Sequence, residues 1–151
     1  MTTSQRFKLS RRQWIVASGL SCMGLPPAQA HEYYAQQFTL IHPWTEPTLP
    51  GQTEARVRFN LQSISGQDRL LGAQFAFSAA AELRSGTDDS AAPLPWIDIQ
   101  PGERMNFDSN GYHVLLKGLT MPLLHDRSYP LAFRFEKSGV LNVMMSMGSM
   151  D

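Results

Sequence analysis

The stretch EARVRFNLQ, residues 54–62, decides the fold class predicted for this chain. Apolar and polar side chains alternate strictly along it, and its apolar positions are Ala55, Val57, Phe59 and Leu61. A period of two is typical of a β-strand that buries one face and leaves the other in water. The stretch therefore predicts a strand whose inner face belongs to a hydrophobic core.

Similar but looser strand-like runs recur along the chain. They cover residues 36–44, 70–80, 96–100, 111–119, 129–136 and 140–147, and turn sequences rich in Gly, Pro and Asp separate them. Short strands with turns of this kind favour an all-β fold, either a β-sandwich or a small barrel. Residues 85–95, which are acidic and rich in small side chains, are expected to form a solvated loop that serves only as a connector. In such a loop the adjacent Asp88 and Asp89 suggest solvation rather than catalysis.

The first thirty residues differ in composition from the rest of the chain. They carry four basic residues and no acid, then an apolar run at 14–25, then the small-residue sequence Ala28-Gln29-Ala30. This order of features is typical of a secretory signal peptide, and we expect cleavage after Ala30. The adjacent Arg11 and Arg12 are similar to a twin-arginine export signal, although an ordinary secretory signal with paired arginines fits equally well.

The signal also bears on location and domain organisation. Its apolar run of twelve residues is shorter than the roughly 20 that span a bilayer, so we expect no membrane anchor after cleavage. Gly19 stands three positions before Cys22 where lipoprotein processing favours a large aliphatic residue. We therefore expect a periplasmic protein, with residues 1–30 as the signal peptide and residues 31–151 as a single domain with a methionine-rich C-terminal end.

Charge and cysteine content narrow the function of the predicted mature chain. Four of the thirteen basic residues and none of the thirteen acidic residues lie in residues 1–30, which leaves a net charge of −4. Such a balance disfavours nucleic acid as a partner. The single cysteine, Cys22, is also removed with the signal, so a soft metal ion would have to bind methionine and histidine instead of thiolate.

One histidine, His113, stands in the otherwise apolar run GYHVLLKGL, residues 111–119. On a strand, His113, Leu115 and Lys117 share one face because alternate side chains point the same way. The pattern alone leaves open whether the imidazole binds a ligand or packs.

Four stretches of the chain resemble the periplasmic copper chaperones of the PCu(A)C family. They are residues 31–51, 70–84, 99–119 and 122–139, and they contain the motifs HPW, PG, GYH, GL, PL and FE in that order. The resemblance implies a cupredoxin-like β-sandwich that binds Cu(I) through two His and two Met. It also implies transfer of copper by ligand exchange to a periplasmic partner, such as a protein that assembles the copper centre of cytochrome c oxidase.

The ligand positions that the resemblance implies are only partly matched. His113 matches one of them, whereas Leu115 stands at the second Met of the His-x-Met pair and Arg84 stands at the first His. Residues 85–95 contain no Met. Either the chain is a metal-free interaction module that uses Arg84 and Lys117 to bind a protein or an anion, or it holds copper with replacement ligands.

Replacement ligands are present at both ends of the predicted mature chain. The C-terminal methionines Met147 and Met150 are thioether candidates, although Met145 and Met147 also suit the core face of a last strand. His31 would become the amino terminus, where its amine and ring nitrogen together chelate Cu(II) if His113, His42 or His125 lies near. We expect copper at His113, Met147, Met150 and His31, with Cu(I) favoured over Cu(II).

Enzyme motifs are missing from the sequence. It contains no glycine-rich phosphate loop, no Gly-x-Ser-x-Gly and no His-Glu-x-x-His. We therefore do not expect an enzyme, and a copper enzyme built on His31 is the third possibility.

Overall fold

The computed structural model describes residues 31–108 and 110–148. The predicted signal peptide and Met150 lie outside these residues. The described residues form ten β-strands and no helix, and none of them therefore forms a helix suited to crossing a membrane. The strands are β1 (Glu32–Tyr34), β2 (Thr39–Thr45), β3 (Glu54–Ile64), β4 (Asp68–Gln74), β5 (Ser78–Ser85), β6 (Ile97–Ile99), β7 (Gly102–Phe107), β8 (Tyr112–Leu119), β9 (Ser128–Phe135) and β10 (Gly139–Met147).

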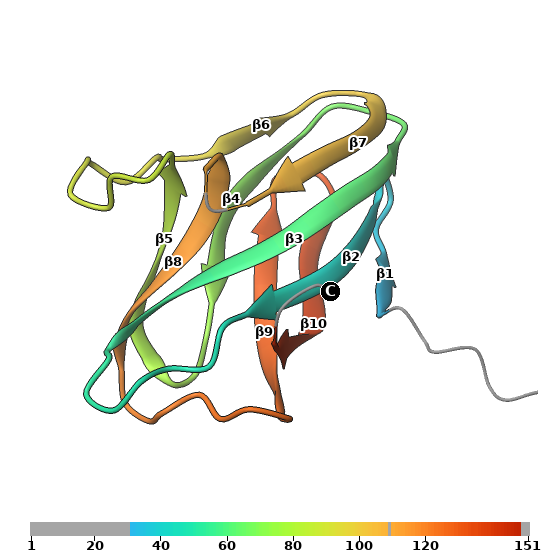
Figure 1. Ribbon diagram of the computed structural model, residues 1–151. Coiled ribbons are helices and arrows are strands. Elements are labelled where there is room, and N and C mark those ends of the chain that lie inside the picture. Colours follow the sequence, from blue (N-terminus) through green and yellow to red (C-terminus); the bar gives the residue numbers. More distant parts are fainter. Residues whose placement is uncertain (1–30, 109, 149–151) are drawn as a thin grey trace, which may run out of the picture.

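Strand β3 contains the alternating stretch and joins the parts of the fold (Figure 1). Its first half, residues 54–57, pairs with β8, and its second half pairs with β2 and β7. The four apolar side chains of that stretch are at most 5% exposed, whereas Arg56, Arg58 and Asn60 between them are half-buried. The predicted two-residue period is therefore confirmed.

The strands form one strongly curved sheet in the order β5-β8-β3-β2-β10-β9-β4-β6. Because β5 at one end of this order also contacts β4, the strand next to the other end, the sheet is nearly closed into a barrel (Figure 1). Phenylalanine rings fill the interior: Phe59 stacks on Phe107 with ring centroids 4.1 Å apart and packs at 4.6 Å against Phe133. The predicted all-β fold is confirmed.

Four strands differ from the sequence-based prediction. The run predicted at residues 70–80 is two strands, β4 and β5, separated by a turn at residues 75–77. Strands β1 and β7 were not anticipated, because β1 is only three residues long and most residues of β7 are exposed. A mostly exposed strand carries few apolar positions, so its alternation is weak in the sequence.

A buried carboxylate ties β4 to the turn between β9 and β10. Asp68 is 4% exposed and accepts hydrogen bonds from the backbone N–H groups of Arg69, Lys137 and Ser138 at 2.8, 2.8 and 3.0 Å. The Ser138 hydroxyl donates a further bond at 2.7 Å. Burial by itself raises the pKa of Asp68, but these hydrogen bonds outweigh burial and hold the pKa below its ordinary value.

Candidate functional site

The imidazole of His113 lies inside the molecule. Its side chain is 0% exposed on β8, where it stands opposite Arg84 of β5. Nδ1 lies 3.2 Å from the carbonyl oxygen of Gly111, and Nε2 lies 3.2 Å from Oδ1 of Asp89. Each ring nitrogen therefore has a hydrogen-bond partner inside the protein. A metal ion would have to displace one of these partners to bind the ring.

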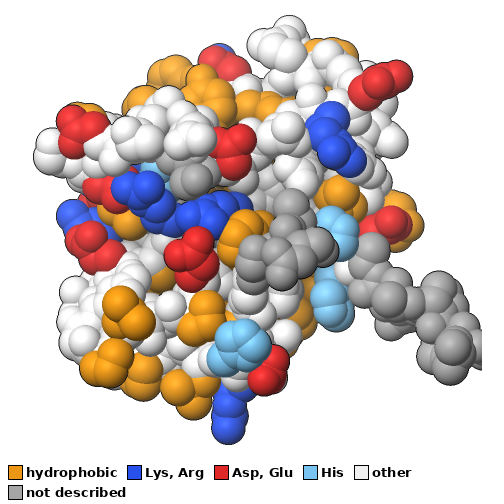
Figure 2. Space-filling view, in the orientation of Figure 1, with side chains coloured by type: hydrophobic (Ala, Val, Ile, Leu, Met, Phe, Trp, Pro, Cys, Tyr) orange, Lys and Arg blue, Asp and Glu red, His pale blue; other side chains and the backbone are white. Residues whose placement is uncertain are grey.

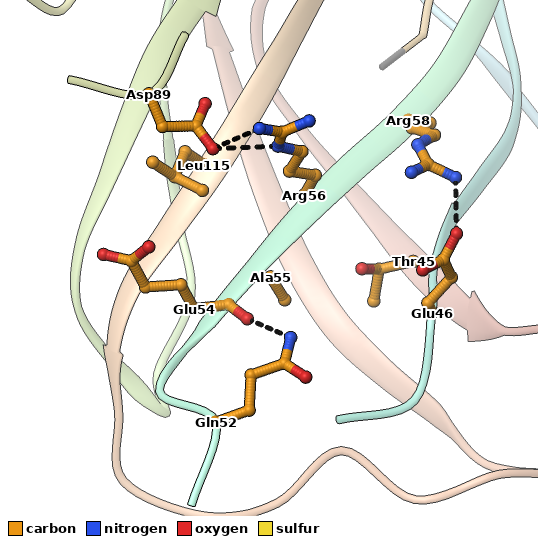
Figure 3. A pocket seen from close by; sticks show the side chains of 9 residues that line it. All are labelled: Thr45, Glu46, Gln52, Glu54, Ala55, Arg56, Arg58, Asp89 and Leu115. Carbon is orange, nitrogen blue, oxygen red and sulfur yellow. Dashed lines mark hydrogen bonds and ion pairs between the residues drawn. The ribbon is translucent and has the colours of Figure 1, made fainter. Parts of the chain in front are cut away.

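Asp89 reaches His113 from the loop between β5 and β6. Its Oδ2 also accepts a hydrogen bond from Nε of Arg56 on β3 at 2.9 Å, and Nη2 of Arg56 donates a second bond to the same oxygen (Figure 3). Partial burial by itself raises the pKa of Asp89, but hydrogen bonds from Arg56 and His113, with their positive charges, outweigh it and lower the pKa. The loop is thus fastened to two strands by one carboxylate.

A second ion pair, between Arg84 and Glu82, lies beside the pair between Arg56 and Asp89. Arg84 is 5% exposed, and its Nε donates to Glu82 Oε2 at 3.1 Å. Lys117 lies 3.9 Å from the same carboxylate, and Leu115, which stands opposite Glu82 on β8, is 2% exposed. The expectation that Arg84 lines an accessible rim is wrong, because the side chain is buried against Glu82. We call Arg56, Glu82, Arg84, Asp89 and His113 the ion-pair cluster.

The ion-pair cluster occupies the end of the fold where the resemblance implied copper. Two guanidinium groups stand there, and a fixed cation repels a metal ion. Among the described residues no three His, Cys, Asp or Glu side chains gather as a metal-binding group. Copper binding by His113 stays a prediction, and it requires Asp89 to leave Nε2.

A cleft of about 380 Å³ opens beside the ion-pair cluster on the outer face of β3 (Figure 3). Charged side chains line most of it, and four of them form two ion pairs. Glu46 pairs with Arg58 at 3.0 Å, and Asp89 pairs with Arg56. Glu54 adds a further carboxylate. Because the charges are paired, the cleft has no strong preference for an anion or a cation.

The methionines of β10 lie on both faces of the strand, one buried and one exposed. Met145 is 0% exposed and Met147 is 9% exposed, so both pack in the core as the last strand. Met144, which precedes Met145, is 40% exposed on the outer face. Metal binding by Met147 and Met150 stays a prediction, and a buried Met147 thioether would have to leave the core to reach a metal.

Register places His31 beside His42. Glu32 of β1 pairs with Ile41 of β2, and the next pair outward joins the His42 N–H to the His31 carbonyl oxygen at 3.3 Å. His31 is exposed and His42 is half-buried. Figure 2 shows pale blue histidine side chains on the right of this face, the side on which Figure 1 has β1 and β2. His113 lies in the ion-pair cluster, and His125 lies in the exposed turn before β9 with its own carboxylate partner, Asp126.

The contacts of Asp89 with Arg56 and His113 were not predicted from the sequence. The loop was expected to be a solvated connector, and the neighbouring Asp88 does behave that way, since among the described residues its carboxylate hydrogen-bonds only to Ser90. Asp89 instead joins partners 33 and 24 positions away along the chain. No local pattern distinguishes the two aspartates, so only the closed loop reveals the difference.

A match to a family model identifies the family of this chain. The LpqE-like family, described as "Putative lipoprotein LpqE-like", matches residues 38–147, which is most of the chain. The chain belongs to the LpqE-like family. No curated protein is similar enough to count as a match.

Solved structures share the fold of this LpqE-like chain. The copper-bound PCuAC domain from PmoF2 has a TM-score of 0.69 at 24% identity, covering 79% of this chain and 98% of that domain. The apo PCuAC domain from PmoF1 has a TM-score of 0.70 at 17% identity, covering 79% and 99%. The Cu(I) form of DR1885 from Deinococcus radiodurans has a TM-score of 0.64 at 20% identity, covering 82% and 83%. The predicted resemblance to PCu(A)C proteins and the predicted cupredoxin-like fold are confirmed.

Proposed function

We propose that this LpqE-like protein is exported to the periplasm, handles copper there in the manner of a copper chaperone, and passes it to a partner protein. The observation that carries the proposal is the PCuAC fold over nearly the whole described domain, since two of the similar domains are copper-bound. The lipoprotein name of the family agrees with export. A copper-accepting protein, such as one that assembles cytochrome c oxidase, is the proposed partner, and no catalytic step is proposed.

We further propose that copper binds outside the ion-pair cluster. At the cluster, His113 is hydrogen-bonded through both ring nitrogens, and Arg84 and Leu115 supply no metal ligand. A chaperone site has to be exposed so that a partner's ligands can displace the protein's ligands one at a time. Of the four predicted ligands, exposed His31 meets this requirement, while Met150 is a proposal that rests on sequence alone.

A competition titration tests the proposal. The secreted mature protein is titrated with Cu(I) and Cu(II) against chelators of known affinity, and His113→Ala is compared with the unaltered chain. We expect both proteins to bind one copper with the same affinity. Loss of copper binding in His113→Ala would place the copper site at the ion-pair cluster. Loss of copper binding in a chain that ends at Val143 would place the site at the methionine-rich end.

The second candidate function is a metal-free interaction module. The ion-pair cluster favours it, because Arg84 stands where the resemblance implies a metal ligand and Asp89 hydrogen-bonds to His113, the one matched ligand. The module would bind its partner through the charged cleft on β3, with Arg56, Arg58 and Glu54, rather than through buried Arg84. Failure of the intact mature protein to compete for copper in either oxidation state would leave this candidate standing.

A further inference from the structure

We propose that the pair Asn110-Gly111 is a site of spontaneous deamidation, that the carboxylate of Asp108 protects it, and that modification there loosens the loop of residues 86–95. The pair lies in the turn between β7 and β8. The inference does not depend on copper binding or on the proposed function. It concerns a covalent change that needs only water as a co-reactant.

Asn110 differs from the other three asparagines of the chain. Asn60, Asn106 and Asn142 lie within β3, β7 and β10 and precede bulky residues. Asn110 is exposed in a turn and precedes Gly111. Glycine has no Cβ, so a neighbouring side chain can approach its backbone nitrogen without hindrance. Among the described residues Asn110 is hydrogen-bonded only through its backbone, and its side chain is free to turn toward Gly111.

The reaction joins the two residues through a cyclic imide. The backbone nitrogen of Gly111 bonds to the side-chain carbonyl carbon of Asn110, and the proton of that nitrogen leaves with the side-chain NH2 group as ammonia. Water then opens the imide at one of its two carbonyl carbons. One opening gives aspartate. The other gives isoaspartate, in which the main chain runs through the former side chain and is one carbon longer.

Asp108 holds the nitrogen that has to react. Its Oδ1 accepts hydrogen bonds from the backbone N–H groups of Gly111 at 2.8 Å and of Asn110 at 2.9 Å. Hydrogen bonds to a carboxylate are stronger than those between neutral groups, and this one must break before the Gly111 nitrogen can attack. A Cβ at position 111 would lie 3.3 Å from the same oxygen. The glycine that makes the pair reactive therefore also lets the protecting carboxylate come close.

The carbonyl group of Gly111 links this turn to the ion-pair cluster. Its oxygen accepts a hydrogen bond from the N–H of Gly86 at 3.0 Å and lies 3.2 Å from Nδ1 of His113. An isoaspartate at position 110 lengthens the main chain directly before this carbonyl group. It also adds a negative charge beside Asp108, and like charges repel. Both changes displace the Gly111 carbonyl, so the loop loses its attachment at Gly86.

Incubation of the secreted protein in mildly alkaline buffer tests the protection. Peptide mapping by mass spectrometry follows deamidation at each of the four asparagines. We expect modification at Asn110 and a rate about tenfold higher or more in Asp108→Ala. Asp88→Ala is the matched control, because Asp88 Oδ1 accepts the Ser90 N–H at 2.9 Å in a turn of the same kind. We expect Asp88→Ala to deamidate at Asn110 as slowly as the unaltered protein.

The modified protein itself tests the effect on the loop. Deamidation adds a negative charge, so ion exchange separates the modified and unmodified fractions of incubated Asp108→Ala, and the substitution is the same in both. We expect residues 86–95 to exchange their amide hydrogens faster in the modified fraction. Asn110→Gln should give no such fraction.

Two results would overturn the inference. Equal rates of Asn110 deamidation in Asp108→Ala and Asp88→Ala would mean that the carboxylate does not protect the pair. Equal hydrogen exchange of residues 86–95 in the two fractions would mean that the turn does not hold the loop. Neither result bears on copper binding, which the competition titration measures separately.

Discussion

Replacing Asp68 with alanine is expected to lower the free energy of unfolding by about 3 kcal/mol. The carboxylate is 4% exposed and accepts four hydrogen bonds, and three of them come from the turn that joins β9 to β10. Alanine leaves those part-buried donors without their acceptor, and it frees the turn from β4. Urea unfolding followed by circular dichroism at pH 7 measures the loss, with a melting temperature about 10 °C lower as a second readout.

The pH dependence of this loss identifies its cause. The pKa of Asp68 is lowered in the folded protein, so its stabilisation is present above the ordinary pKa of about 4. It is lost as the pH falls through the lower, folded value. The difference between the unaltered protein and Asp68→Ala should therefore shrink as the pH falls below about 4.

Asp98→Ala is the matched control for Asp68. Asp98 lies on neighbouring β6, and its carboxylate is 57% exposed in a surface ion pair with Arg69. Exposed pairs contribute little, so we expect a change below about 1 kcal/mol. If Asp68→Ala unfolded at the same urea concentration as Asp98→Ala, the buried carboxylate would not hold the turn as described.

Replacing Asp89 with alanine is expected to lower the free energy of unfolding by about 2 kcal/mol and to loosen the loop of residues 86–95. The change removes the acceptor of the buried His113 ring and the partner of Arg56. Hydrogen exchange measured by mass spectrometry should show faster exchange in that loop. Copper affinity should not rise, because Arg84 and Leu115 still stand where ligands would be needed.

Asp88→Ala is the control for this second prediction. Asp88 is adjacent in sequence and carries the same charge, and its carboxylate hydrogen-bonds only to Ser90 among the described residues. We expect it to leave the stability and the loop's hydrogen exchange almost unchanged. Equal effects of the two substitutions would mean that net charge, rather than the contact with His113, stabilises the loop. A gain in Cu(I) affinity in Asp89→Ala alone would instead make His113 a ligand released by loop opening.

Particular residues illustrate which strands and core positions could be predicted from the sequence. The alternation of Ala55, Val57 and Phe59 predicted both the strand and its buried face, because neighbouring positions on a strand point to opposite sides. Met145 and Met147 were correctly anticipated as core residues of the last strand on the same grounds. In contrast, β7 was missed, because an exposed strand lacks the apolar period that reveals a buried one.

The sequence by itself determined the all-β class, the family resemblance and the incomplete set of implied copper ligands, since these depend on residue identity and short-range order. Only the tertiary structure decided that His113 is sealed by Asp89 and that His31 stands beside His42. The first depends on where a loop closes and the second on which strands pair, and both join residues far apart in the chain. Residue order alone carries no record of such contacts, because they arise when the whole core packs and brings distant strands and loops into register.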